Sequence, residues 1–268
     1  MPELPEVETV LRTLETKIKD KKILDIVVLY APIVEGDVAD FKNKLIGQHF
    51  RDFKRRGKYL LFEMDDITLV SHLRMEGKYF YVEDGYKYDK HTHIIFKLDD
   101  GHLLLYHDVR KFGRMELIPK TGDYSIFKKL GPEPFDERFN LSYCKNYLSK
   151  KQNPIKEILL DQSFVAGIGN IYDDEILFGI GVSPFKKGCD LSDTDIINLI
   201  NETRKVLSEA IKCGGTTIRS YTSSLGVTGR FQQSLRCHTM KVCPKCGGDI
   251  KKVKLKGRGA YYCPNCQK

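Results

Sequence analysis

The amino-acid sequence predicts an α+β fold: a β-rich N-terminal domain that opens with a helix, a helical second domain, and a small metal-binding ribbon. Three observations support this prediction. Residues 23–118 consist mostly of short segments rich in β-forming residues. After residue 134 the spacing of apolar residues becomes helical, and two Cys-x-x-Cys pairs lie near the end of the chain. With 268 residues, of which 41% are hydrophobic, the chain can form two domains with separate apolar cores.

The N-terminal part is predicted to be one helix followed by a series of strands. About the first 20 residues form the helix, because Leu4, Val7, Leu11, Leu14 and Ile18 recur at helical spacing. Six or more short strands bounded by glycine or acidic turns suggest a β-sandwich or a flattened barrel. The predicted strands are Ile23–Tyr30, Tyr59–Met64, Thr68–Leu73, His93–Leu98, His102–Tyr106 and Arg114–Ile118.

A domain boundary is predicted at Gly131-Pro132-Glu133-Pro134, because glycine and proline interrupt regular structure. Beyond it, Asp195–Lys212 places its apolar residues on one broad face, and Gly214-Gly215 ends this helix. We therefore expect an N-terminal β-rich domain over residues 1–132, a helical domain over 138–236 and a small C-terminal ribbon over 237–268.

Four cysteines near the end of the chain predict a metal site. Cys243 and Cys246 form one Cys-x-x-Cys pair, and Cys263 and Cys266 form another after sixteen intervening residues. Each pair places two thiolates on one side of a tight turn, and two pairs complete a tetrahedron around Zn²⁺. A disulfide pair or redox dithiol is the alternative, but no signal peptide is visible. Four protein ligands leave no open position, so we expect one structural Zn²⁺.

The charge distribution suggests a nucleic-acid partner. Lys plus Arg number 44 against 36 Asp plus Glu, a net charge of +8. Residues 241–268 hold seven Lys and one Arg against a single Asp. Such a basic ribbon favours contact with phosphates. No apolar run is long enough for a membrane span, so no membrane partner is expected. Unpaired Cys144, Cys189, Cys213 and Cys237 are typical of a reducing cytosol, and we expect a cytoplasmic protein.

The residues that follow the initiator methionine suggest covalent chemistry. Removal of Met1 would leave Pro2 with a free secondary amine whose pKa should be about 8. Such an amine attacks a carbon at the aldehyde oxidation level and gives an iminium ion, which acts as an electron sink. The adjacent Glu3 could transfer protons. The alternative is a plain helix start, since Pro2 and the acids Glu3, Glu6 and Glu8 suit the helix dipole.

Seven segments, in this order, resemble the formamidopyrimidine-DNA glycosylase family of bacterial base-excision enzymes. They are PELPEVETV at 2–10, RRGKYL at 55–60, SHLRMEGKY at 71–79, DVRKFG at 108–113, LLDQSFVAGIGNIYDDE at 159–175, GGTTIRSY at 214–221 and KGRGAYYCPNCQ at 256–267. The resemblance runs nearly from end to end. It implies an N-terminal β-sandwich with an N-terminal helix, a helix-two-turn-helix domain, a C-terminal zinc ribbon, and a monomer that binds damaged double-stranded DNA between its two domains.

The resemblance also implies phosphate contacts by Lys58, Asn170 and Arg258. From the residues alone, Arg55–Lys58 would be a solvated basic turn, and Asn170 would be a simple helix N-cap. Asn170 follows two glycines that let a backbone approach an anion at a helix N-terminus. Arg258 lies between glycines at the tip of a hairpin and can hold a phosphate bidentately. Lys58 is placed beside the active-site phosphates.

A second group of residues is implied to act on the bases. A glycosylase must extrude its target nucleotide and fill the hole that remains. Met75 and Phe112 can wedge between bases, and Arg110 can hydrogen-bond the orphaned partner base. Ordinary strand packing is the alternative for Met75 and Phe112. His72 is a candidate phosphate contact, and Lys156 matches a family lysine associated with lesion handling.

The predicted function is that of a bifunctional DNA glycosylase and abasic-site lyase for oxidised purines, acting through a Pro2 Schiff base and β,δ-elimination. One alternative is an endonuclease VIII-like glycosylase for oxidised pyrimidines, but that branch usually begins Pro-Glu-Gly-Pro and this chain has Leu4. The other is a catalytically silent, zinc-dependent DNA-binding protein. Residues Thr216–Arg230, rich in Thr, Ser and Gly, match the family's loop over the flipped base.

The chain departs from the family pattern before the first zinc cysteine. Residues 235–240 replace the family's Val-Tyr-Gly-like stretch, and the spacer looks about two residues shorter. This departure leaves the docking of the ribbon undetermined by the sequence. It also places Cys237 and His238 where they could compete as metal ligands.

Overall fold

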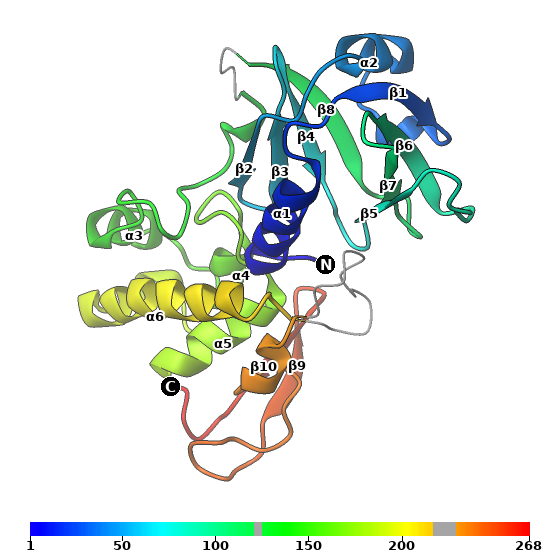
Figure 1. Ribbon diagram of the computed structural model, residues 1–268. Helices are drawn as coiled ribbons and strands as arrows, with labels where there is room; N and C mark the ends of the chain where they lie inside the picture. Colours follow the sequence, from blue (N-terminus) through cyan, green and yellow to red (C-terminus); the bar gives the residue numbers. More distant parts are fainter. Residues whose placement is uncertain (121–124, 217–228) are drawn as a thin grey trace. The chain divides into compact units, whose positions relative to one another are not determined.

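The computed structural model describes residues 1–120, 125–216 and 229–268 (Figure 1). The chain divides into two compact units. Unit 1 comprises Met1–Lys128 and Gly214–Gly229, and unit 2 comprises Lys129–Cys213 and Arg230–Lys268.

Unit 1 contains two four-stranded antiparallel sheets and the N-terminal helix. Their strand orders are β1-β6-β7-β5 and β2-β3-β4-β8. Helix α1 lies against β2 and β3 (Figure 1). Apolar side chains from α1 and from both sheets form one continuous core. The elements are α1 (Leu4–Ile18), β1 (Ile23–Val28), η1 (Ala31–Ile33), α2 (Val38–Leu45), β2 (Asp52–Arg56), β3 (Tyr59–Glu63), β4 (Ile67–His72), β5 (Lys78–Glu83), β6 (Thr92–Leu98), β7 (His102–His107), β8 (Arg114–Pro119) and η2 (Ser125–Phe127).

The predicted N-terminal helix and all six predicted strands are confirmed, with ends that differ by up to two residues. Strands β2 and β5 and helix α2 were not predicted. Only Tyr79 of β5 and only Phe53 of β2 are buried, so neither strand carries the regular apolar face that marks a half-buried strand. Helix α2 buries only Phe41 and Leu45 and is eight residues long. These three elements are therefore the ones with the weakest sequence signal.

Unit 2 contains four α-helices and a two-stranded ribbon among its described residues. Helix α5 lies beside α4, α6 and β10. Helix α6 begins two residues earlier than predicted because Ser192 and Asp195 form a capping box, each side chain accepting the other's backbone N–H. The elements are α3 (Leu141–Leu148), α4 (Ile155–Leu160), α5 (Asn170–Ile180), η3 (Gly188–Asp190), α6 (Asp193–Lys212), η4 (Phe231–Ser234), β9 (Lys251–Leu255) and β10 (Arg258–Tyr262).

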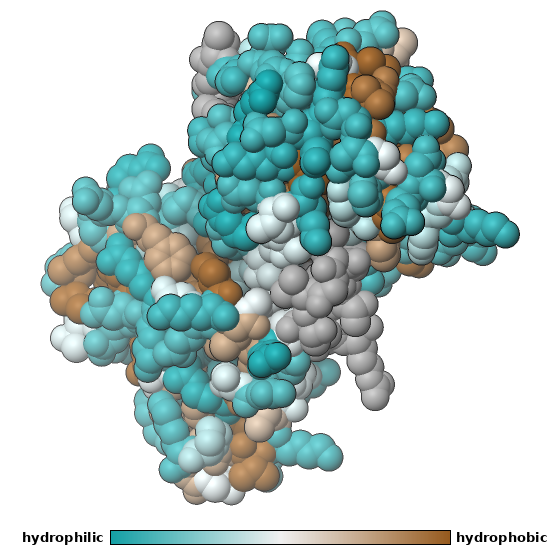
Figure 2. Space-filling view, in the orientation of Figure 1, coloured by the Kyte–Doolittle hydropathy of each residue, from teal (hydrophilic) through white to brown (hydrophobic). Residues whose placement is uncertain are grey.

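The surface of unit 1 is largely hydrophilic, as expected for a chain in which 30% of the residues are charged. Figure 2 shows mostly hydrophilic residues over the strands of unit 1 on the face turned to the viewer. Within the described part of the chain, no helix has both the length and the apolar character required to cross a bilayer.

Candidate nucleic-acid interface and metal centre

The N-terminal residues are held by a network of hydrogen bonds around Glu6. Glu3 is the N-cap of α1, and Glu3 and Glu6 form a capping box in which each side chain accepts the other's backbone N–H. Glu6 Oε2 accepts from Glu3 N at 2.8 Å, while Glu6 Oε1 accepts from Thr216 N at 2.8 Å and from its hydroxyl at 3.0 Å. Pro2 and Glu3 are both buried. The structure therefore confirms the helix start, and this arrangement is compatible with the catalytic hypothesis.

Lys58 lies in the turn between β2 and β3, and the solvated-turn interpretation of Arg55–Lys58 is wrong. Lys58 is only 7% exposed. Arg55 donates from Nε to Glu8 Oε2 at 2.8 Å and from Nη1 to the Gly57 carbonyl at 2.9 Å. Gly57 has a φ of +56°, which allows the chain to reverse there. The turn is thus a fixed platform that holds Lys58.

His72 lies near Lys58, because His72 pairs with Tyr59 across β4 and β3. Burial, helped by the positive charges of Arg74 and Lys58, lowers the pKa of His72 to about 3. The ring is therefore neutral at physiological pH. Its Nδ1 accepts from Arg74 N at 3.0 Å, so the single ring proton lies on Nε2. His72 can contact a phosphate only as a neutral hydrogen-bond donor.

Met75, Arg110 and Phe112 lie in loops rather than in strands. Met75 lies in the turn between β4 and β5, and the other two lie in the loop between β7 and β8. Phe112 is 48% exposed, and the Arg110 guanidinium lies 4.8 Å from its ring centroid. Ordinary strand packing is therefore excluded for Met75 and Phe112. An exposed aromatic ring beside an exposed cation can reach a base stack.

The loop that carries Arg110 and Phe112 is organised by one buried carboxylate. Asp108 is fully buried and accepts three backbone N–H bonds: from Arg110 at 2.9 Å, from Phe112 at 2.9 Å and from Gly113 at 2.8 Å. Lys111 within this loop has a φ of +59°. The carboxylate thus fixes an otherwise unfavourable backbone conformation.

The two loops also meet at one side chain. A Cβ atom at Gly77, after Met75, would overlap the hydroxyl of Tyr106, and so would a Cβ atom at Gly113. Tyr106 itself is fully buried. Both loops therefore approach the same hydroxyl, and only glycine allows that approach at either position. This contact connects the position of Met75 to that of Phe112.

In unit 2, Asn170 is the first residue of α5, and the N-cap position belongs to Gly169. The simple Asn N-cap interpretation is therefore wrong. Gln162 fixes the preceding turn, because it accepts from Gly167 N at 2.9 Å and donates to the Ile168 carbonyl at 2.9 Å. Gly167 has a φ of +99°. The turn presents Asn170 at the positive end of a helix dipole, where an anion is stabilised.

Lys156 is buried within unit 2, and this argues against a direct contact with DNA. Its side chain is 1% exposed, and its Nζ lies 2.6 Å from Asp173 Oδ2 and 2.8 Å from Asp174 Oδ1. Burial opposes the charged form, but the two carboxylates outweigh it and raise the pKa of Lys156. In this structure Lys156 acts inside the fold, where it pairs with two buried carboxylates.

Arg258 begins strand β10 directly after a two-residue turn. Lys256 and Gly257 have φ values of +40° and +83°, and the register pairs Leu255 with Arg258. Positive φ at both central positions is typical of the tight hairpin turns that match the strand twist. The side chain of Arg258 is exposed. It can therefore reach a phosphate, as the sequence predicts.

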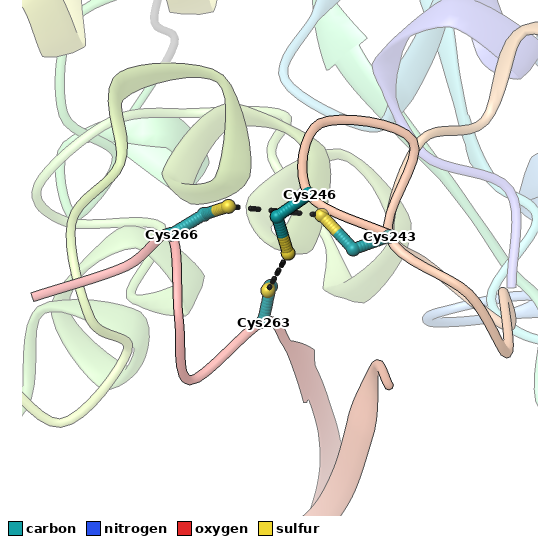
Figure 3. A group of neighbouring side chains, drawn as sticks. All are labelled: Cys243, Cys246, Cys263 and Cys266. Carbon is teal, nitrogen blue, oxygen red and sulfur yellow. Dashed lines mark hydrogen bonds between the residues drawn. The ribbon is translucent and has the colours of Figure 1, made fainter. Parts of the chain in front are cut away.

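The four predicted zinc ligands converge at the base of this hairpin (Figure 3). The sulfur atoms of Cys243, Cys246, Cys263 and Cys266 all lie within 4.8 Å of one another. The N–H of Gly248 donates to Cys246 Sγ at 3.4 Å. Four sulfur atoms this close together can complete a tetrahedron, so the cluster fits one structural Zn²⁺ with no open position.

Cys237 and His238 are engaged elsewhere. The Cys237 thiol donates to the Tyr261 carbonyl at 3.1 Å, and burial raises the pKa of that thiol. His238 Nδ1 lies 2.7 Å from Asp174 Oδ2. Among the residues that the structure describes, neither joins the cysteine cluster. The idea that they compete as ligands is therefore not supported.

Comparison with known proteins assigns three successive parts of the chain to known domains. Residues 1–115 match the formamidopyrimidine-DNA glycosylase N-terminal domain, residues 130–222 match the H2TH domain of the same enzymes, and residues 241–268 match the zinc finger found in FPG and IleRS. The chain is 46% identical over 272 residues to the formamidopyrimidine-DNA glycosylase of Streptococcus pneumoniae, covering 100% of this chain and 99% of that one. The chain belongs to the formamidopyrimidine-DNA glycosylase family.

Other relatives agree. The Listeria monocytogenes formamidopyrimidine-DNA glycosylase is 44% identical, with full coverage of both chains. A Lactococcus lactis FPG variant in complex with Fapy-dG-containing DNA superposes with a TM-score of 0.95 at 42% identity and full coverage. The Lactococcus lactis Fpg bound to abasic-site DNA gives a TM-score of 0.94 at 42% identity, covering 99% of each chain. The chain is therefore a DNA-binding enzyme of DNA repair, a DNA glycosylase with a C-terminal zinc finger.

Sequence reasoning missed the residues that position this site. Glu6, Asp108, Gln162 and Asp174 each make several hydrogen bonds that fix the backbone near a candidate site residue, yet none was predicted to have this role. An acid or amide within a motif is a weak signal by itself, because its partners are distant in sequence or are backbone groups. Most of the matched Thr216–Arg230 loop lies outside the described residues.

Proposed function

We propose that this chain removes 8-oxoguanine and formamidopyrimidines from duplex DNA and then cleaves the strand at the abasic site. Family membership and the buried Pro2–Glu3 pair at the start of α1 support this proposal. The solved relatives bound to Fapy-dG DNA and to abasic-site DNA represent a substrate and an intermediate of such a reaction.

In the proposed mechanism, Met1 is removed and the Pro2 amine attacks C1′ of the damaged nucleotide. The base departs and takes up a proton, while Glu3 protonates the ring oxygen and opens the sugar. The resulting iminium ion acidifies C2′. Loss of that proton expels the 3′ phosphate, and a second elimination expels the 5′ phosphate, which leaves a one-nucleotide gap. Glu3 is suited to proton transfer because it is covalently adjacent to the nucleophile and held in the capping box.

The DNA contacts in this proposal fall into two groups. Lys58, His72, Asn170 and Arg258 hold phosphates, which positions the duplex without reading its sequence. Met75, Arg110 and Phe112 occupy the space left by the extruded nucleotide. We further propose that the enzyme acts as a monomer and is a cytoplasmic, bacterial-type protein that associates with the nucleoid in use; its bacterial repair relatives support the cytoplasmic location.

The test is to trap the covalent intermediate. Sodium borohydride should join the enzyme to a duplex that carries 8-oxoguanine opposite cytosine, and peptide mapping should place the DNA on Pro2. Pro2→Gly should lose most of this adduct. An adduct on a lysine peptide would overturn the Pro2 assignment. Faster trapping on a thymine glycol duplex would favour the endonuclease VIII-like alternative, and no trapping on either duplex would favour a silent DNA-binding protein.

A further inference from the structure

A chain of buried ionisable groups runs through unit 2, and the mechanism does not use it. Lys156 on α4 bonds to Asp173 and Asp174 on α5, and His238 bonds to the second of these carboxylates. His238 is the most exposed of the four residues, at 7%. A buried charge is costly unless it is paired, so these groups must occupy fixed positions relative to one another.

Asp174 connects α5 to two separate parts of the C-terminal segment. Its Oδ2 faces His238 Nδ1 at 2.7 Å, and its Oδ1 accepts from the backbone N–H of Tyr261, on β10, at 3.2 Å. The next residue, Glu175, accepts from the backbone N–H groups of Cys237 and His238, both at 2.8 Å. Two consecutive acids of one helix thus hold the ribbon at both its entry and its second strand.

The two residues joined by this contact, Asp174 and Tyr261, lie close in sequence to the two residues of unit 2 that are proposed to bind phosphates. Asp174 lies four residues after Asn170 on α5, which is about one helical turn. Tyr261 lies three residues after Arg258 on β10. The bond between Asp174 and Tyr261 therefore joins the element that begins with Asn170 to the strand that begins with Arg258.

We propose that Asp174, held by Lys156 and by His238, is a joint that sets the spacing between the Asn170 and Arg258 phosphate contacts. This inference rests on the proposed function, since it assumes that both residues bind phosphates. His238 is a positioning residue in this account and touches no DNA. Lys156 acts within the fold in this account, by balancing the charge of Asp173 and Asp174.

The experiment is a double-mutant cycle on binding to a duplex with a tetrahydrofuran abasic-site analogue. His238→Leu removes the donor to Asp174, and His238→Asn places an amide N–H near the position of Nδ1. We expect His238→Leu to weaken binding about tenfold, equivalent to about 1.4 kcal/mol, and His238→Asn to restore most of it. In an Arg258→Ala background the same change should cost less than about twofold, because its effect is exerted through Arg258. Met240→Ala, an exposed neighbouring change, is the control and should bind normally.

Two further readouts separate the possible failures. Zinc content should remain one per chain in His238→Leu, and amide exchange at Tyr261 should become faster in that variant but not in Met240→Ala. The proposed role of Asp174 is wrong if amide exchange at Tyr261 is unchanged in His238→Leu, or if that variant loses zinc. It is also wrong if the double variant loses DNA affinity by the product of the two single-variant factors, because His238 would then act independently of Arg258. If Arg258→Ala alone binds like the unmodified enzyme, the phosphate contact in the proposed function is wrong, whatever the exchange data show.

Discussion

Replacing Asp108 by Asn should impair base extrusion much more than strand cleavage. Asp108 is buried and accepts N–H bonds from Arg110, Phe112 and Gly113 within the loop that carries two of the base-contacting residues. Asn has nearly the same shape but only one acceptor oxygen. Because Oδ2 serves two of the donors, the favoured orientation keeps the oxygen there and turns the NH₂ group toward the Arg110 N–H.

The size of the effect follows from these bonds. A hydrogen bond to a charged group contributes about 1.5–3 kcal/mol, and one to a neutral group contributes about 0.5–1.5 kcal/mol. Losing one bond and weakening two should destabilise the closed loop by about 3–5 kcal/mol. The loop can open locally, so the free energy of unfolding of the whole protein should fall by less. The exposed ring of Phe112 should then no longer be held in position to fill the space of the extruded base.

The assay compares two substrates under single-turnover conditions. Excision of 8-oxoguanine should fall at least about tenfold more than cleavage of a pre-formed abasic site, because extrusion of an abasic residue requires less unstacking. Asp84→Asn is the matched control: it removes the same charge from another loop of unit 1, where the one donor that Asp84 has among the described residues is the exposed Gly85 N–H, at 2.9 Å. If the two variants change the substrate ratio equally, the loop-organising role of Asp108 is refuted.

Three other results are expected. Glu3→Gln should bind the lesion normally but turn over about 10²-fold or more slowly, since it removes the proton donor while preserving shape; normal base release would exclude that role. Cys263→Ser should lose zinc and DNA binding while Cys237→Ser keeps both, and metal analysis showing the reverse would overturn the ligand set. The folded-state pKa of His72, about 3, is below its unfolded value, so the unfolded chain binds more protons between these values. Stability should therefore decrease as pH falls below about 6.5, by up to about 1.4 kcal/mol per pH unit from this group. The decrease should be smaller in His72→Gln, as measured by urea unfolding at several pH values. If the variant and the unmodified protein show the same pH dependence, His72 titrates normally.

Much of the fold could be predicted because its signals are local. The apolar residues of α1 repeat at helical spacing, and the confirmed strands are bounded by turn residues. Strands β2 and β5 escaped prediction because each buries a single side chain. Their places in the sheets are determined by pairing with β3 and β7, which is information from other parts of the chain.

In the candidate site, too, residues with a local sequence signal could be predicted, and residues whose partners are distant in sequence could not. The zinc cysteines could be predicted because their spacing encodes the geometry, and the position of Arg258 after a tight turn could be predicted because glycine precedes it. The role of Lys156 could not, because its two partners lie 17 and 18 residues away on another helix. A lysine in a motif looks equally suited to a phosphate or to a buried carboxylate until the fold shows which one it faces.

The acids around the candidate site suggest how an enzyme that binds a polyanion can still use carboxylates. An unpaired carboxylate near a phosphate is repelled, yet Glu6, Asp108 and Asp174 all lie close in sequence to residues proposed to act on DNA. Each is buried, and each is surrounded by donors: backbone N–H groups for Glu6 and Asp108, a lysine and a histidine for Asp174. Their charge is thus used to fix the backbone that presents Glu3, Phe112 and the ribbon, rather than being exposed to the DNA. Replacing any one of them by an isosteric amide would reduce the negative charge and still be expected to weaken lesion processing, the opposite of what simple electrostatic repulsion predicts.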